Sequence, residues 1–341
     1  MPPQLPVMGQ EARTPSNARV VLVVVFGLLA LVAGTAVLGC AGLFWLAHSA
    51  RQNLVAAAAA AQASAVKLIE TPNITYVERD GKPLKLDLFQ PQEMKQPLPL
   101  VVCIHGGGWQ SGNKEAFAGF ARYFAQNGFI AVSVQYRLAP AARYPAQIED
   151  VRSAIRWLRA NADKYQIIKE QVGVVGGSAG GHLALLAGLM DDPSDPPADD
   201  PHADESCKAQ AIVNYFGPAD FGKQDWPPVV EKMLENLMGG DRTKLAKEFA
   251  AASPVSHIDA HDPPVLTFHG TADALVPYNQ ATGLHAALKE AGVQNELETL
   301  TGEGHGFSPG QWVRTLEMSQ RFLTEILVEG AEEELTPLPT K

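Results

Sequence analysis

The sequence predicts an α/β fold over residues 71–328, in which helices cover both faces of a mostly parallel sheet. Strand-like and helix-like segments alternate along this part of the chain, which is the pattern of an α/β sheet. Several strand-like segments are continuous apolar runs, as expected of strands that are buried on both faces. The helix-like segments carry apolar residues at three- and four-residue steps, with charged residues on the opposite face.

Length, composition and charge exclude several other classes of protein. The chain has 341 residues, of which 46% are hydrophobic and 19% are charged, and this is an ordinary globular composition. The formal net charge is -10, which argues against nucleic acid as a partner because a phosphate backbone binds a basic surface. The three cysteines form no Cys-x-x-Cys pair and are too few and too scattered for a disulfide framework.

The beginning of the chain predicts a membrane anchor. Residues 20–47 contain no charged residue, and as a helix they would span about 42 Å, which exceeds the hydrocarbon core of about 30 Å. Two arginines lie in segment 1–19, so this segment is expected on the cytoplasmic side and the rest of the chain on the other side. The alternatives are secretion after cleavage of a signal peptide and a lipoprotein modified at Cys40. Residues 48–70 are alanine-rich and are expected to form a linker.

Within the domain, each element follows from a local pattern. Residues 85–89 alternate apolar and polar side chains, which predicts an antiparallel edge strand. The apolar runs predict buried strands at 98–104, 129–134, 172–175 and 264–268, and a further strand-like run lies at 296–300. Helical periodicity predicts helices around 148–158, 179–189, 284–288 and 313–323.

Three segments interrupt or follow this alternation. Residues 191–205 are rich in acidic residues and prolines, which predicts a solvated excursion from the domain. Residues 219–253 combine a Trp-Pro-Pro run with a helix-like piece, which predicts a small lid-like insertion over the sheet. Residues 329–341 are acidic, end in prolines and are expected to form a frayed tail.

The pattern Gly-x-Ser-x-Gly at residues 176–180 provides the candidate nucleophile, Ser178. It lies between a predicted strand and a predicted helix, which is the context of a nucleophile elbow with its serine on a strained turn. Gly176 and Gly180 would let neighbouring backbone approach without a clash, and the helix N-terminus favours negative charge. The alternative is a glycine-rich turn with a serine that takes no part in catalysis.

A second glycine-rich run, His-Gly-Gly-Gly-Trp, follows the predicted strand 98–104. Attack by a serine creates a tetrahedral oxyanion, which needs preorganised backbone N–H donors, and a loop of this type can supply them. No Gly-Lys-Ser/Thr follows, so a phosphate-binding P-loop is excluded. The candidate donors are the amides of Gly107, Gly108 and Ala179. His105 and Gly106 are expected to support the loop.

A serine nucleophile needs a base, and the base needs an orienting acid. Asp273 lies just beyond the predicted strand 264–268, where open α/β sheets place catalytic groups. His305 lies between two glycines after the strand-like run 296–300, and the order Ser, acid, His suits this type of elbow. The histidines that compete as base are His105, His182, His257, His261 and His269. We expect no metal site at any of them.

These motifs resemble those of the α/β-hydrolase superfamily, and within it the esterases and lipases that have an HGGG loop. The matching motifs are 105–109, Tyr-Arg-Leu-Ala-Pro at 136–140, 145–150, 176–182, 269–273 and Val-Pro at 276–277. The hormone-sensitive-lipase-like and the bifunctional feruloyl/acetyl esterase-like families are the most similar, over residues 72–326. The resemblance implies Ser178 as nucleophile, Asp273 as acid and His305 as base.

The expected reaction is hydrolysis of a small-molecule carboxylic ester through an acyl-enzyme, without a metal or an organic cofactor. The resemblance leaves acetyl, short-acyl and feruloyl esters open. One alternative is an amide-cleaving peptidase or formamidase on the same scaffold. The other is a membrane-tethered binding protein without catalysis. The sequence predicts no oligomeric state.

Overall fold

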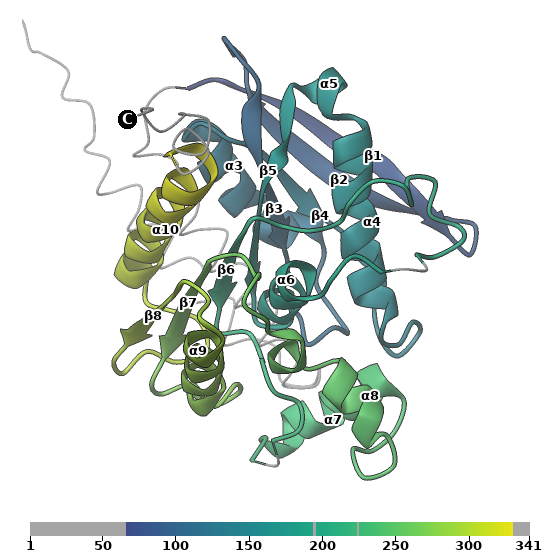
Figure 1. Ribbon diagram of the computed structural model, residues 1–341, viewed down its shortest axis with the longest axis vertical. Coiled ribbons are helices and arrows are strands. Elements are labelled where there is room, and N and C mark those ends of the chain that lie inside the picture. The colour runs from purple at the N-terminus through teal and green to yellow at the C-terminus, as the bar shows by residue number, and fades with distance from the viewer. Residues whose placement is uncertain (1–65, 194–195, 224, 330–341) are drawn as a thin grey trace, which may run out of the picture. The chain divides into compact units, whose positions relative to one another are not determined.

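The computed structural model describes residues 66–193, 196–223 and 225–329 (Figure 1). The predicted anchor at 20–47, its alternatives, and the tail beyond residue 329 lie outside the described residues. Across the described ranges, every helix is too short or too polar to cross a membrane.

The described residues form an eight-stranded sheet whose order is β1-β2-β4-β3-β5-β6-β7-β8. The strands are β1 (Leu68–Arg79), β2 (Lys82–Pro91), β3 (Leu98–Ile104), β4 (Ile130–Val134), β5 (Ile167–Gly177), β6 (Ala211–Tyr215), β7 (Val265–Gly270) and β8 (Asn295–Leu300). The pairs β1/β2 and β2/β4 are antiparallel, and all other neighbours are parallel. The predicted mostly parallel α/β sheet is therefore confirmed.

The central strands are largely apolar because helices cover both faces of the sheet. In β3, Leu100, Val102 and Ile104 pack into one core cluster, and Val101 and Cys103 pack into the other. Successive side chains of a strand point to opposite faces, so both sets are buried only where both faces are covered. This explains why the sequence of the strand is a continuous apolar run.

The helices divide between the two faces of the sheet. They are α3 (Ala118–Gln126), α4 (Ala146–Ala160), α5 (Ala162–Tyr165), α6 (Ala179–Leu189), α7 (Pro228–Met238), α8 (Ala246–Ala251), α9 (Asn279–Ala291) and α10 (Pro309–Thr324). Short helical turns lie at Lys114–Phe117, Pro254–His257 and Glu325–Glu329. Helices α4, α6 and α9 share one core cluster with the sheet, whereas α3 and α10 share the other.

Two expectations about the start of the domain are wrong. Strand β2 contains the predicted segment 85–89 and is antiparallel, but β1 lies outside it and forms the edge of the sheet. Strand β1 begins at Leu68, inside the segment predicted as linker, because Pro91 of β2 still pairs with it there. The exposed and polar side chains of β1 fit an edge strand, and they hide its strand character from apolar periodicity.

The acidic segment 191–205 is not simply a solvated excursion. Within its described part, Asp200 is buried and forms an ion pair of 3.1 Å with Arg156 of α4. The same carboxylate accepts a hydrogen bond of 2.7 Å from Ser153 Oγ. A buried carboxylate is stable only when such partners replace its hydration. The segment therefore packs against α4, and Arg152 and Arg156 of that helix bind it rather than water.

The insertion predicted at 219–253 contains α7 and α8, which Figure 1 shows at one end of the sheet, outside the layer of α4, α6 and α9. Its start is fixed by Gln280 of α9, whose side-chain oxygen accepts the amides of Ala219 at 3.0 Å and Asp220 at 2.8 Å. Its end is joined to its start, because the Phe221 amide donates to Ser253 Oγ at 2.9 Å.

Candidate active site

Ser178 lies on a sharp turn between β5 and α6. Its backbone has φ 56° and ψ −121°, a left-handed conformation that a non-glycine residue rarely adopts. The turn is fixed because the Ser178 amide donates to the carbonyl of Tyr215 at 2.9 Å. The carbonyl of Ser178 accepts the amide of His182 at 3.0 Å and so continues directly into α6.

The strain at Ser178 leads to a stability prediction. We expect the free energy of unfolding of Ser178→Gly to be about 1 kcal/mol higher than that of Ser178→Ala, because glycine tolerates positive φ and alanine does not. Urea unfolding of the two variants would measure this difference. Equal free energies of unfolding would show that the turn is not strained.

The glycines of the motif lie where no side chain fits. A Cβ at Gly176 would lie 2.1 Å from the carbonyl oxygen of Gly180, and a Cβ at Gly180 would lie 2.1 Å from that of Ile104. Both are contacts with backbone, which cannot rotate away as a side chain can. Close approach of backbone at Gly176 and Gly180, predicted from the motif, is therefore confirmed.

The structure brings Ser178, His305 and Asp273 into one hydrogen-bonded chain. His305 Nε2 lies 3.0 Å from Ser178 Oγ, and His305 Nδ1 lies 2.8 Å from Asp273 Oδ2. A carboxylate only accepts hydrogen bonds, so Nδ1 carries a proton and a neutral ring can accept the Ser178 hydroxyl proton at Nε2. Three segments that are far apart in the sequence meet here because β5, β7 and β8 are parallel and end at the same edge of the sheet.

Asp273 is buried and kept ionised. Its other oxygen, Oδ1, accepts the amides of Leu275 at 2.8 Å and Val276 at 2.9 Å. Burial alone would raise the pKa of Asp273, but interactions with His305 and His269 outweigh burial and hold it well below its usual range. The carboxylate is therefore charged and fixed in orientation.

Two backbone amides of the glycine loop after β3 have no hydrogen-bond acceptor in the part of the chain that the structure describes. Gly107 has φ 132° and Gly108 has φ 57°, which are conformations that favour glycine. The carbonyl of Gly107 accepts the amides of Gln110 at 3.1 Å and Ser111 at 3.0 Å, which fixes the turn. Among the described residues, no acceptor takes the N–H of Gly107 or Gly108. Ala179 begins α6, so its N–H has no acceptor within the helix.

His105 supports the loop and does not contact Ser178. Its ring is buried and stacks on Tyr136 with ring centroids 4.2 Å apart. Its Nδ1 lies 2.8 Å from the carbonyl oxygen of Gly106, and the Tyr136 hydroxyl donates to the carbonyl of His105 at 2.9 Å. These contacts explain why the loop is well defined although three consecutive residues are glycines.

The other histidines considered as base have hydrogen-bond partners other than Ser178 Oγ. His269 Nε2 lies 2.9 Å from the carbonyl oxygen of Val276, and His257 Nε2 lies 2.8 Å from that of Ala251. His182 contacts Trp109 and Ala252. His261 is exposed on a loop.

Sequence reasoning missed two residues near the glycine loop. Met233 of α7 lies so close to Gly108 that a Cβ there would be 2.8 Å from its sulfur. The side-chain nitrogen Nδ2 of Asn236, one turn further along α7, donates to the side-chain oxygen of Gln110 at 2.9 Å. Both contacts join parts of the chain that are distant in sequence, and no local pattern in α7 signals them. They show that the insertion covers the outer side of the loop.

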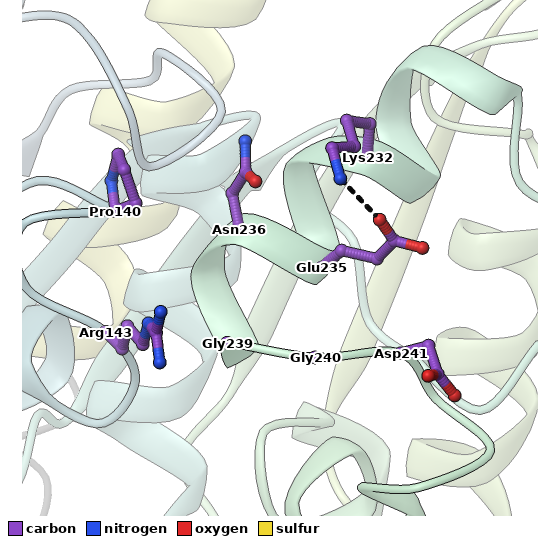
Figure 2. A pocket seen from close by; sticks show the side chains of 8 residues that line it. All are labelled: Pro140, Arg143, Lys232, Glu235, Asn236, Gly239, Gly240 and Asp241. Carbon is purple, nitrogen blue, oxygen red and sulfur yellow. Dashed lines mark hydrogen bonds and ion pairs between the residues drawn. The ribbon is translucent and has the colours of Figure 1, made fainter.

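A cavity of about 290 Å³ lies beside this contact, between residues 140–143 and the C-terminal half of α7. Figure 2 shows its polar lining, in which Arg143 faces the chain around Gly239 and Lys232 pairs with Glu235. Ser178, Asp273 and His305 do not line it. The cavity therefore lies next to the glycine loop and not at Ser178.

Two buried histidines make the stability of the fold depend on pH. Burial lowers the pKa of both His105 and His182 to about 4, whereas a histidine in an unfolded chain has a pKa of about 6.5. Below pH 6.5 these histidines bind protons in the unfolded chain but stay neutral in the folded protein. Their contribution to the free energy of unfolding is therefore fully present above pH 6.5 and is lost as the pH falls towards 4. We expect the free energy of unfolding to fall by about 2 kcal/mol per histidine between pH 7.5 and pH 5.

Urea unfolding at the two pH values would measure this loss. The variant His182→Phe should lose roughly half of the pH dependence, and the exposed control His261→Asn should keep all of it. A free energy of unfolding that does not change from pH 7.5 to pH 5 would contradict neutral buried rings.

The sheet, the elbow and the order of the three polar residues define an α/β-hydrolase fold. Residues 86–288 match the BD-FAE family, and this match covers more than half of the chain. The chain therefore belongs to the BD-FAE family, in agreement with the resemblance read from its motifs.

Curated relatives support the same class of protein. The chain is 34% identical over 228 residues to a probable carboxylic ester hydrolase, LipM, and 32% identical over 237 residues to the esterase LipC, both from Mycobacterium tuberculosis. The matches cover 65% and 67% of this chain but only 52% and 58% of those proteins. The chain thus spans little more than half the length of these relatives.

Two solved structures of esterases share the fold over almost their whole length. A truncated carbohydrate esterase from gut microbiota has a TM-score of 0.68 and 28% identity, and the match covers 75% of this chain and 95% of that one. The thermophilic esterase Est2 of Thermogutta terrifontis, with propionate bound, has a TM-score of 0.64 and 30% identity. That match covers 78% of this chain and 96% of Est2.

Proposed function

We propose that the protein hydrolyses carboxylic esters through an acyl-enzyme on Ser178. The observation that carries this proposal is the hydrogen-bonded chain from Ser178 Oγ through both ring nitrogens of His305 to Asp273 Oδ2. An activated serine of this kind has no purpose in a protein that only binds. The esterases among the relatives support the same activity.

The proposed reaction has two similar halves. Ser178 Oγ attacks the ester carbonyl while His305 Nε2 takes its proton, and the same nitrogen then gives that proton to the leaving alcohol. Asp273 keeps the proton of the ring on Nδ1 and stabilises the imidazolium that forms. Water then attacks the acyl group, again with His305 as base, and the acid leaves as Ser178 is restored.

The amides of Gly107, Gly108 and Ala179 are the proposed donors to the oxyanion in both halves. Their support is that the two loop amides have no acceptor among the described residues and that Ala179 begins a helix. The helix N-terminus adds a favourable dipole for the negative charge. One such donor is worth about 2.7–4 kcal/mol of transition-state stabilisation in other serine hydrolases.

The proposed substrates carry short acyl groups. Met233 lies against Gly108, so the insertion limits the space on that side of the loop. The relative Est2 binds propionate, which is a short acid.

Comparison of matched esters and amides tests the proposal. The full chain, kept in detergent, would be assayed on p-nitrophenyl esters from acetyl to dodecanoyl, on a feruloyl ester, and on the p-nitroanilide of the best acyl group. We expect the highest kcat/KM on short-acyl esters and at least tenfold less on the anilide. Preference for the anilide would favour a peptidase or formamidase, and a folded protein that turns over no ester would contradict the proposal.

Anchoring of the protein by residues 20–47 is a separate proposal, supported by the uncharged run in the sequence. Fractionation of cells that express the full chain tests it. The protein should remain in the membrane fraction after washing with high salt and carbonate, and release by either wash would contradict a spanning helix.

A further inference from the structure

One histidine of α6 joins the glycine loop to the insertion. The indole nitrogen of Trp109 donates to His182 Nδ1 at 3.2 Å, and His182 Nε2 lies 2.7 Å from the carbonyl oxygen of Ala252. An indole N–H is only a donor and a carbonyl is only an acceptor. A neutral ring with its proton on Nε2 is therefore the form that satisfies both partners.

The surroundings of His182 are buried and aromatic. The ring is fully buried and stacks on Phe221, with ring centroids 4.5 Å apart and an angle of 12° between the planes. The Trp109 ring contacts both of them edge-on, at 5.3 Å from His182 and 5.5 Å from Phe221. Since Phe221 lies near the start of the insertion and Ala252 near its end, both ends meet close to this ring.

Trp109 directly follows the two glycines that are the proposed oxyanion donors. It has φ 59°, an uncommon backbone conformation for a large side chain. Its carbonyl accepts the amide of Ala139 at 2.8 Å, and its side chain is fixed by His182. Because Trp109 is bonded to Gly108, a fixed Trp109 restricts how the Gly108 backbone, and with it the Gly108 N–H, can rotate.

His182 also lies one turn after Ser178, whose carbonyl accepts the His182 amide. One turn of α6 thus carries both the candidate nucleophile and the side chain that fixes the end of the glycine loop. A direct contact between this turn and the glycine loop would keep the distance between Ser178 and the loop amides constant.

We propose that His182 is a positioning residue for the oxyanion loop: through Trp109 it fixes the loop relative to Ser178, and through Ala252 it joins the loop to the insertion 219–253. This role rests on the proposed ester hydrolysis at Ser178. His182 takes no proton from the substrate, because both of its nitrogens are occupied by Trp109 and Ala252.

The test uses variants that separate the two hydrogen bonds. His182→Asn keeps an acceptor near the position of Nδ1 and loses the reach to Ala252. His182→Gln keeps a donor near the position of Nε2 and loses the bond to Trp109. His182→Phe keeps a ring against Phe221 and loses both bonds. Tyr76→Phe is the control for stability, because it removes the hydrogen bond of a buried hydroxyl, to the carbonyl of Gln135, and Tyr76 lies on the edge strand β1, far from β5 and β7 in the sheet.

The measured quantity is kcat per active site, with sites counted from the burst of acyl-enzyme on a p-nitrophenyl ester. Loss of a whole oxyanion donor lowers kcat by about 10²–10³, so a displaced loop should lower it by about 10- to 100-fold in His182→Phe and in His182→Gln. We expect KM to change by less than about threefold, since the donors act on the transition state. His182→Asn should recover most of kcat, and Tyr76→Phe should keep all of it.

The possible failures differ from one another. A wild-type protein that shows no burst and no labelling by a fluorophosphonate would overturn the proposed function and this role with it. A wild-type protein that reacts, beside a His182→Phe variant with the same kcat per site, would overturn only the role of His182. Equal losses in His182→Asn and His182→Gln would contradict the assignment of positioning to the Trp109 bond.

Discussion

Replacement of Ser178 by alanine is expected to lower kcat for ester hydrolysis by about 10⁶-fold while the fold remains intact. The proposed reaction starts with attack by Ser178 Oγ, which lies 3.0 Å from the nitrogen that takes its proton. Without this oxygen no acyl-enzyme forms, and loss of the nucleophile of a serine hydrolase triad costs on the order of 10⁶ in rate. Initial rates on the best p-nitrophenyl ester would measure the loss.

The control is Ser319→Ala, which removes a buried hydroxyl from α10 and its hydrogen bond of 2.7 Å with the Tyr215 hydroxyl. This variant removes a buried serine hydroxyl that is not part of the candidate site. Its kcat should therefore stay within about twofold of wild type. Residual activity of Ser178→Ala above about one thousandth of wild type would show that another group carries the reaction.

The second large effect is expected at Gly180, where alanine should disrupt both the fold and the activity. A Cβ there would lie 2.1 Å from the carbonyl oxygen of Ile104 and 2.6 Å from that of His105, and neither can move without shifting β3 or α6. Overpacking of a well-packed core costs typically about 1–3 kcal/mol and more where only backbone can yield. We expect a free energy of unfolding at least 3 kcal/mol lower, or no soluble protein.

Gly283→Ala in α9 is the matched control for this change. A Cβ at Gly283 meets nothing within 4 Å, so alanine should stabilise this helix by up to about 1 kcal/mol. The same substitution is therefore expected to have opposite signs in two helices of one protein. Equal destabilisation of both variants in urea unfolding would contradict the packing of α6 against the end of β3.

Much of the fold could be predicted from local pattern. The helix α6 begins and ends where the sequence predicted it, because a glycine motif precedes it and its residues are apolar throughout. Most of the buried strands could be recognised because both of their faces lie in the core. Strand β6 is also fully buried, but its short segment was not predicted from the sequence. Strand β1 could not, since an edge strand has exposed polar side chains that do not alternate clearly.

The residues of the candidate site that lie just beyond the carboxyl ends of strands could be predicted. Ser178, Asp273 and His305 follow β5, β7 and β8, and parallel strands bring such positions to one edge of the sheet. The partners that depend on packing between distant segments could not be predicted. Met233 over Gly108, His182 between Trp109 and Ala252, and the burial of Asp200 are contacts of this kind.

Covalent labelling by a fluorophosphonate tests the central claim most directly, because it needs an activated serine but no knowledge of the substrate. Wild type, Ser178→Ala and His305→Ala would be treated under the same conditions, and the adducts would be counted by intact mass and located by peptide mapping. We predict one adduct per wild-type chain, located on Ser178, none on Ser178→Ala, and at least a hundredfold slower labelling of His305→Ala. No adduct on the folded wild-type protein, or an adduct on another serine, would contradict catalysis by Ser178, His305 and Asp273.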